Sequence, residues 1–203
     1  MRMALRYFGT EIREKQLVRV LKDLGFFVTP RTGVYASELG LIGLRFGYNV
    51  RLEVPPTALP NVLMWNGRGR ADMPDDSVIR QRLLSMDSRV LSKRVVRGLY
   101  SYVRAGGEML VHETRASDIC KSTHQGAVVI LKVVSSEYYR CYERWKHFLV
   151  AVPRRDSFTI LDSYSEGIRK DYPVRGESYI DFARNYDWSE WHDMILSLKP
   201  VSG

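Results

Sequence analysis

The sequence predicts an α+β fold, in which N-terminal helices pack on a C-terminal antiparallel sheet. Two observations favour this class. Apolar residues recur at a spacing of three and four in the first part of the chain, whereas β-branched residues form nearly continuous runs from Ala127 onward. Helices followed by a meander of strands are typical of α+β proteins. We expect one domain over residues 1–203, with 64–76 as an exposed loop or insertion because glycine, proline and aspartate interrupt its apolar pattern.

Helices are expected mainly before residue 104. The segment Leu17–Leu24 is amphipathic, with Thr10 as its expected cap and Gly25 at its end. Ala4–Phe8 looks like the end of an earlier apolar helix that has no capping residue ahead of it. Further helices are expected over Ser37–Phe46, Ser77–Met86 and Ser88–Val103, and two closing helices over Tyr179–Tyr186 and Ser189–Leu198.

Strands are expected where β-branched and aromatic residues gather. Asn49–Val54 alternates as a short strand and stops at two prolines. Ala127–Val134 (A-V-V-I-L-K-V-V) is apolar almost throughout, as in a strand that is covered on both faces. Two more strands, His147–Val152 and Ser157–Leu161, are separated by a hairpin turn at Pro153–Asp156.

Composition excludes several protein classes. An apolar fraction of 45% with 27% charged residues is ordinary for a globular protein and argues against disorder. No apolar stretch is long enough to span a membrane, and the start of the chain does not resemble a signal peptide, so we expect a cytoplasmic protein. Two cysteines are too few for a disulfide framework, and we expect both to be reduced. We expect no cofactor.

The chain is basic, with 31 Lys and Arg against 23 Asp and Glu and a net charge of +8. This charge permits attraction to nucleic acid but does not demonstrate it, and the sequence shows no zinc-finger spacing or other recognised nucleic-acid-binding motif. A solvated helical surface is the simpler interpretation, and a basic nucleic-acid-binding protein is the alternative. The basic face consists of Arg80, Arg82, Arg89, Lys93, Arg94, Arg97 and Arg104.

Two residues at the predicted hairpin could form an acid–base pair. His147 opens one strand and Asp162 follows the end of the next, so the hairpin would bring both to one edge of the sheet. Cysteine-protease chemistry requires a histidine that moves a proton and a carboxylate or amide that orients the imidazole. On spacing alone, an alternative remains open, in which His147 only begins a strand and Asp162 only begins a turn.

The run H-F-L-V-A-V-P-R-R-D-S-F-T-I-L-D-S resembles the signature of the cysteine peptidases that process double-glycine leaders of bacteriocins. In this papain-like family a histidine, a strand, a short turn, a second strand and an aspartate follow in that order. The start M-A-L-R-Y-F-G and the segment Leu17–Gly25 look like the family's nucleophile helix and the helix after it. The strand Ala127–Val134 and the segment Asp171–Phe182 also resemble parts of the family pattern.

The resemblance implies a papain-like fold in which His147 and Asp162 are the catalytic His and Asp, and a peptide or protein substrate. The family's nucleophilic Cys would precede Met1. The expectation is therefore a cysteine peptidase, a hydrolase, if an upstream Cys exists. Otherwise we expect a pseudoenzyme that binds a peptide or amide without cleaving it, or a protein in which another cysteine has taken over.

The remaining cysteines and histidines have simpler interpretations. Cys120 and Cys141 are expected to be ordinary thiols, because neither lies in a setting that favours a thiolate. A zinc site would need these two cysteines with His124 and His147, but their spacing departs from the common frameworks, so we expect no metal site. The other two histidines, His112 and His192, show no partner in the sequence, and we expect them at the surface.

Overall fold

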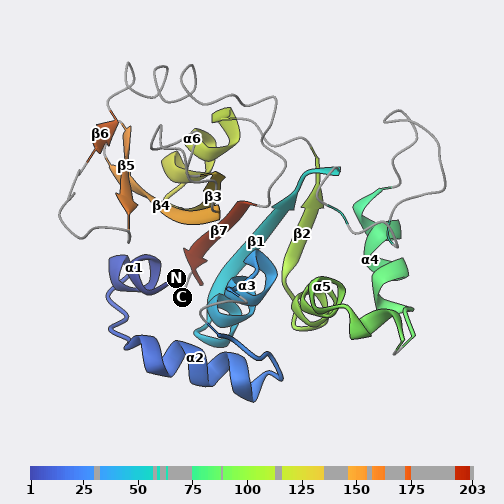
Figure 1. The fold of residues 1–203 in the computed structure, drawn as a ribbon. Coiled ribbons are helices and arrows are strands. Elements are labelled where there is room, and N and C mark those ends of the chain that lie inside the picture. The colour runs from blue at the N-terminus through green and yellow to red at the C-terminus, as the bar shows by residue number, and fades with distance from the viewer. Residues whose placement is uncertain are drawn as a thin grey trace.

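One mixed β-sheet runs through the described part of the chain and carries helices on both faces (Figure 1). The computed structural model describes residues 1–29, 33–56, 59, 63, 75–87, 89–112, 116–134, 146–154, 157–162, 172–174 and 195–201. The predicted combination of helices and sheet is confirmed. The expected loop at 64–76 lies outside the described residues except for its last two, Asp75 and Asp76, which cap and begin a helix.

The strands are β1 (Tyr48–Val54), β2 (Glu108–Val111), β3 (Val128–Val134), β4 (Lys146–Arg154), β5 (Ser157–Asp162), β6 (Tyr172–Val174) and β7 (Ile195–Pro200). Within the described ranges these seven strands form one sheet in the order β2-β1-β7-β3-β4-β5-β6. Only β1 and β2 are parallel, and the other neighbouring pairs are antiparallel. The predicted strands at β1, β3, β4 and β5 are confirmed, whereas β2 and β6 were not predicted.

The helices are α1 (Arg2–Tyr7), α2 (Glu14–Asp23), α3 (Ala36–Arg45), α4 (Asp76–Leu84), the 3-10 turn η3 (Val90–Ser92), α5 (Arg94–Arg104) and α6 (Ala116–His124). A parallel strand pair requires a crossover instead of a tight turn, and α4, η3 and α5 form the crossover between β1 and β2. The prediction of one helix over Ser88–Val103 is wrong in one respect. The backbone of Lys93 is extended and separates η3 from α5. Helix α6 was not predicted.

Side chains at the third helical position cap α2 and α3. The Arg13 amide donates a hydrogen bond to Gln16 Oε1 (2.8 Å), and the Tyr35 amide donates to Glu38 Oε2 (3.1 Å). The prediction that Thr10 caps α2 is wrong. Its hydroxyl instead lies 2.6 Å from the Tyr48 hydroxyl, so it ties the loop before α2 to the start of β1.

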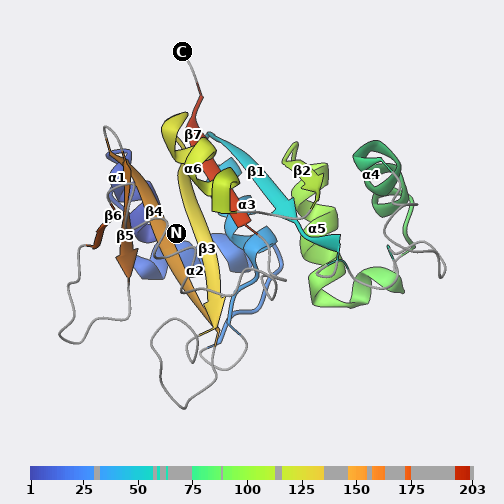
Figure 2. The ribbon, with the colours of Figure 1, turned by 90° about the horizontal axis from the view of Figure 1, so that it is seen from above.

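Alternation along the strands separates two apolar cores. On one face, Val50 and Leu52 of β1 pack with the buried residues of α1 to α5. On the other face, Leu149 of β4 and Phe158 of β5 form a second cluster with Ile119 of α6. Figure 2 shows α6 on the opposite side of the sheet from α3. The sheet is therefore covered on both faces, which explains why its central strands are apolar throughout.

The structure corrects the prediction of a closing helix over Ser189–Leu198. Residues Ile195–Pro200 form β7, which lies between β1 and β3 in the middle of the sheet. Ile195, Leu196, Ser197 and Leu198 are all buried, so no exposed position reveals a period of two. Periodicity cannot distinguish a short buried strand from part of a buried helix. The other closing helix, Tyr179–Tyr186, lies outside the described residues.

Tyr102 of α5 fixes the crossover to both parallel strands. Its single hydroxyl proton is shared between the carbonyl oxygens of Val50 in β1 (2.8 Å) and Glu108 at the start of β2 (2.9 Å), and its side chain is fully buried. Its ring lies between two glycines. A Cβ added at Gly40 would lie 2.6 Å from Tyr102 Cε2, and one at Gly107 would overlap the same ring. Burial raises the pKa of Tyr102, so its hydroxyl remains a donor.

Replacing Tyr102 by Phe should lower the free energy of unfolding by about 1–2 kcal/mol, because the buried Val50 carbonyl and the part-buried Glu108 carbonyl lose the donor they share while the ring still fills its place. Chemical denaturation followed by circular dichroism measures the change. Tyr100→Phe on the same helix is the matched control. Its exposed hydroxyl only accepts from Arg104, so it should change stability by less than about 0.5 kcal/mol. Equal losses in both variants would contradict the proposed role of Tyr102.

Candidate functional sites at one end of the sheet

The hairpin places the backbones of His147 and Asp162 at the same end of β4 and β5. Asp162 is paired with Leu149, which follows His147 by two residues, and His147 is paired with Val133 on the other side. The two residues are thus diagonal neighbours, and such neighbours are roughly 7–8 Å apart and within reach of longer side chains. Their side chains lie outside the described part, so an interaction between His147 and Asp162 stays a prediction.

Helix α1 lies along β4, and its N-terminal end points toward the end of the hairpin where His147 and Asp162 lie (Figure 2). The Tyr7 hydroxyl, at the last residue of α1, donates to the Pro153 carbonyl near the end of β4 (3.1 Å). Figure 2 shows the N mark of the chain beside β4, nearer to the beginning of this strand than the other end of α1 is. The N-terminal end of α1 therefore points toward the end of the sheet where β4 begins with Lys146 and His147.

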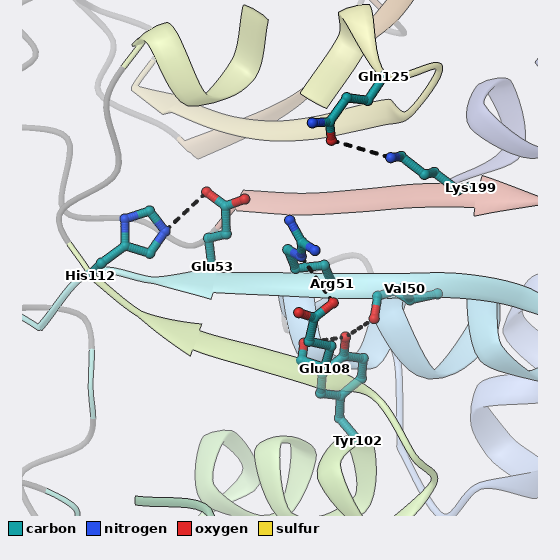
Figure 3. Close-up of polar contacts among 8 residues, drawn as sticks. All are labelled: Val50, Arg51, Glu53, Tyr102, Glu108, His112, Gln125 and Lys199. Atoms are coloured by element: carbon teal, nitrogen blue, oxygen red, sulfur yellow. Dashed lines mark hydrogen bonds and ion pairs between the residues drawn. The ribbon is translucent and has the colours of Figure 1, made fainter. Parts of the chain in front are cut away.

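A second polar cluster lies at the same end of the sheet, on β1 and β2. Arg51 and Glu53 alternate with the buried Val50 and Leu52, so they lie on the face of the sheet that α6 covers elsewhere. Glu53 is only 4% exposed. His112, which follows β2, places its Nε2 3.3 Å from Glu53 Oε2 (Figure 3). This arrangement joins a buried carboxylate to an imidazole whose side chain is 39% exposed.

Burial is the main electrostatic influence on Glu53. Removal from water raises the pKa of the Glu53 carboxyl, and the negative charge of Asp118 on α6 raises it further. His112 and Arg51 oppose this shift in pKa. The Arg51 Nε–H group also donates a hydrogen bond to Glu108 Oε2 (2.9 Å), so part of the Arg51 charge is directed toward the neighbouring strand (Figure 3).

The expectation that His112 has no partner is wrong, because it pairs with Glu53. The sequence did contain one signal, since Asn49–Val54 carries charged residues at alternate positions of an otherwise apolar strand. The partner could not be identified, because the crossover separates Glu53 from His112 and β2 was not predicted. His192 and Cys141 lie outside the described residues, as do the side chains of Cys120 and His147. Among the side chains that are described, no three His, Cys, Asp or Glu residues converge as metal ligands.

Several arginines of the basic face contact other parts of the chain. Arg94 donates two hydrogen bonds to the fully buried Glu38 carboxylate (2.6 and 2.7 Å), and these bonds raise the pKa of the Arg94 guanidinium. The Arg97 guanidinium lies over the Phe26 ring at 5.1 Å, and that of Arg104 lies over a tyrosine ring of its own helix at 5.9 Å. These three residues therefore contribute to packing, and nucleic-acid binding by the basic face stays a prediction.

Comparisons with protein-family models, curated proteins and solved structures found no match to this chain. A search of the described residues found no helix with the length and apolar character needed to cross a membrane.

Glu53→Gln should stabilise the protein more at pH 8 than at pH 4. Because folding raises the pKa of Glu53 above its ordinary value of 4.5, the folded state holds this proton more tightly than the unfolded state. The contribution of Glu53 to stability therefore falls as pH rises from about 4.5 through the raised pKa. Urea unfolding of wild type and variant across this pH range measures the difference in free energy of unfolding.

The matched control is Glu108→Gln on the neighbouring strand, whose side chain is 52% exposed. Its stability difference from the wild type should vary much less with pH. A Glu53→Gln difference that stays constant or shrinks with rising pH would show that burial does not disfavour the Glu53 carboxylate.

Proposed function

We propose that this chain is a cysteine-peptidase-like domain of papain-like architecture that binds a peptide or amide at the end of the sheet where His147 and Asp162 lie. The observation that carries the proposal is the register of the β4–β5 hairpin. It sets the His147 and Asp162 backbones on adjacent strands, two positions out of register, at one end of the sheet. The resemblance to the family's signature implies that His147 is the catalytic histidine and Asp162 the residue that orients it, and the hairpin geometry is compatible with these roles.

In the enzymatic form, a thiolate would attack the carbonyl carbon of the bound amide. The C–N bond would then break, the His147 imidazole would give its proton to the departing amine, and water would release the acyl group from sulfur. Asp162 would accept a hydrogen bond from the imidazole and hold its orientation. No metal or cofactor is needed for this sequence of steps.

If residues precede Met1, the direction of α1 would carry them toward the end of the sheet where β4 begins (Figure 2). His147 begins β4 six residues before Pro153, a distance of about 20 Å along a strand. The six residues of α1 cover about 9 Å of that distance, and about seven more helical residues would cover the rest. A cysteine about two turns before Met1 would thus lie level with His147, as the family resemblance implies.

The packing of β4 limits how such a thiol could approach. Val150 belongs to the core shared with α1, whereas Leu149 and Ala151 belong to the cluster under α6. An attack from an extension of α1 would therefore take place around the end of β4, not across the face of the sheet. Without an upstream cysteine, the same end of the sheet would bind a peptide or amide without cleaving it, as a pseudoenzyme.

Asp162→Asn should lower the pKa of the His147 imidazole by roughly one unit or more, because the imidazolium loses a neighbouring negative charge. NMR titration of histidine-labelled protein measures this pKa. The chain contains four histidines, and His147→Gln identifies the resonance.

Asp87→Asn is the matched control, since this carboxylate lies next to η3 and receives hydrogen bonds from the amides of Arg89 and Val90. It should leave the His147 titration unchanged. If Asp162→Asn also leaves that titration unchanged while the variant folds normally, His147 and Asp162 do not interact and the proposed function fails.

A further inference from the structure

Two buried side-chain oxygens among the described residues accept no hydrogen bond, and they lie near each other on the sheet. They are Glu53 Oε2 and Ser197 Oγ. Glu53 is 4% exposed and Ser197 is 6% exposed, so bulk water does not satisfy either atom. A buried polar atom without a hydrogen-bond partner destabilises the folded state, so such an atom needs an explanation.

The register of β1 and β7 places the two residues on one face. Glu53 is paired with Ile195, and Ser197 is two residues farther along β7, opposite Arg51. Ile195 belongs to the cluster under α6, so Ser197 and Glu53 share that face of the sheet. Glu53 and Ser197 are therefore diagonal neighbours, with a separation of roughly 7–8 Å between their backbones. One small group between them could contact both oxygens.

The charges around Glu53 favour a cation as this group. Arg51, the fixed cation beside Glu53 on β1, bonds to Glu108, and the His112 imidazole, 3.3 Å from Glu53 Oε2, offsets only part of the rise in the pKa of Glu53 that burial causes. Lys199, farther along β7, donates to Gln125 (3.3 Å) at the end of α6 (Figure 3). A neutral water would supply a hydrogen bond but would not offset a buried carboxylate that also experiences the field of Asp118.

We propose that Glu53 and Ser197 form a binding site for a protonated primary amine, which enters beside the half-exposed His112. The ammonium group donates one hydrogen bond to Glu53 Oε2 and another to Ser197 Oγ. Three N–H groups on a single nitrogen suit acceptors that lie apart on two strands. A metal ion is disfavoured, because it needs converging ligands and none converge among the described residues.

This site is independent of the proposed peptidase-like function. β7, β3 and β4 lie between Glu53 on β1 and Asp162 on β5. At a strand spacing of about 4.8 Å, the two positions are roughly 19 Å apart. Failure of the His147–Asp162 pair would therefore leave the amine site standing, and the reverse also holds.

The test is a titration of the 15N-labelled protein with three probes at pH 7.5, following the amide signals of Glu53, His112 and Ser197. Nα-acetyl-lysine amide carries the ammonium group, Nα-acetyl-norleucine amide is its uncharged match, and spermidine represents a free polyamine. We expect the lysine derivative to bind and the norleucine derivative not to bind. Glu53→Gln should weaken binding at least about tenfold, since a hydrogen bond to a charged group is lost.

Glu108→Gln is the matched control and should change the affinity less than about threefold, because this exposed carboxylate bonds to Arg51 and not to the site. Ser197→Ala should weaken binding by a smaller factor than Glu53→Gln. Binding of spermidine in place of the lysine derivative, with the same dependence on Glu53, would support the ammonium site and identify a polyamine as its ligand.

Wild-type protein provides a readout that does not depend on the folding of any variant. The lysine derivative should bind more tightly as pH rises from about 5 to 8, because burial raises the pKa of Glu53 and the ionised carboxylate that forms at higher pH favours a bound cation. Arg51, His112 and Asp118 are the other titratable groups that act on Glu53. Equal binding of the norleucine derivative, full affinity in Glu53→Gln, affinity that falls with rising pH, or displacement of the amine by Zn²⁺ would each overturn the proposal.

Discussion

The rest of the sheet depends on the insertion of β7 between β1 and β3. This strand comes from the C-terminal end of the described chain and pairs on one side with β1, from the N-terminal third, and on the other with β3. Without β7, β2–β1 and β3–β4–β5–β6 would be two separate pieces. Leu196 and Leu198 face the core shared with α1 to α5, and Ile195 faces α6, so β7 also contributes to both cores.

The pairing of β7 with strands that are distant in the chain also limits how much of the fold could be predicted from sequence. Local patterns gave most of the helices and the β4–β5 hairpin, because each depends on residues that are close in the chain. β7 could not be predicted from its own residues, since its four buried positions show no alternation and its partners are more than 60 residues away. β2 escaped prediction because its four residues follow a long crossover and are only partly buried.

The two candidate sites differ in the same way, because one depends on residues close in the chain and the other on residues far apart. His147 and Asp162 were identified as a possible pair because a hairpin is a local structure, and the register now gives their backbone positions. The interaction of Glu53 with His112 depends on a parallel strand pair, which joins residues that no short-range pattern connects. Buried polar groups such as Glu53 and Ser197 interrupt apolar strands, and this interruption is the only sequence signal that they leave.

Native-state hydrogen exchange of the β7 amides tests most directly whether this strand unites the sheet. If β7 joins the two pieces, the amides of Leu196, Ser197 and Leu198 should exchange only through global unfolding, together with those of β1 and β3. Their opening free energies should equal the free energy of unfolding measured with denaturant. Exchange of β7 at lower free energy, with β1 and β3 opening in separate steps, would contradict the account.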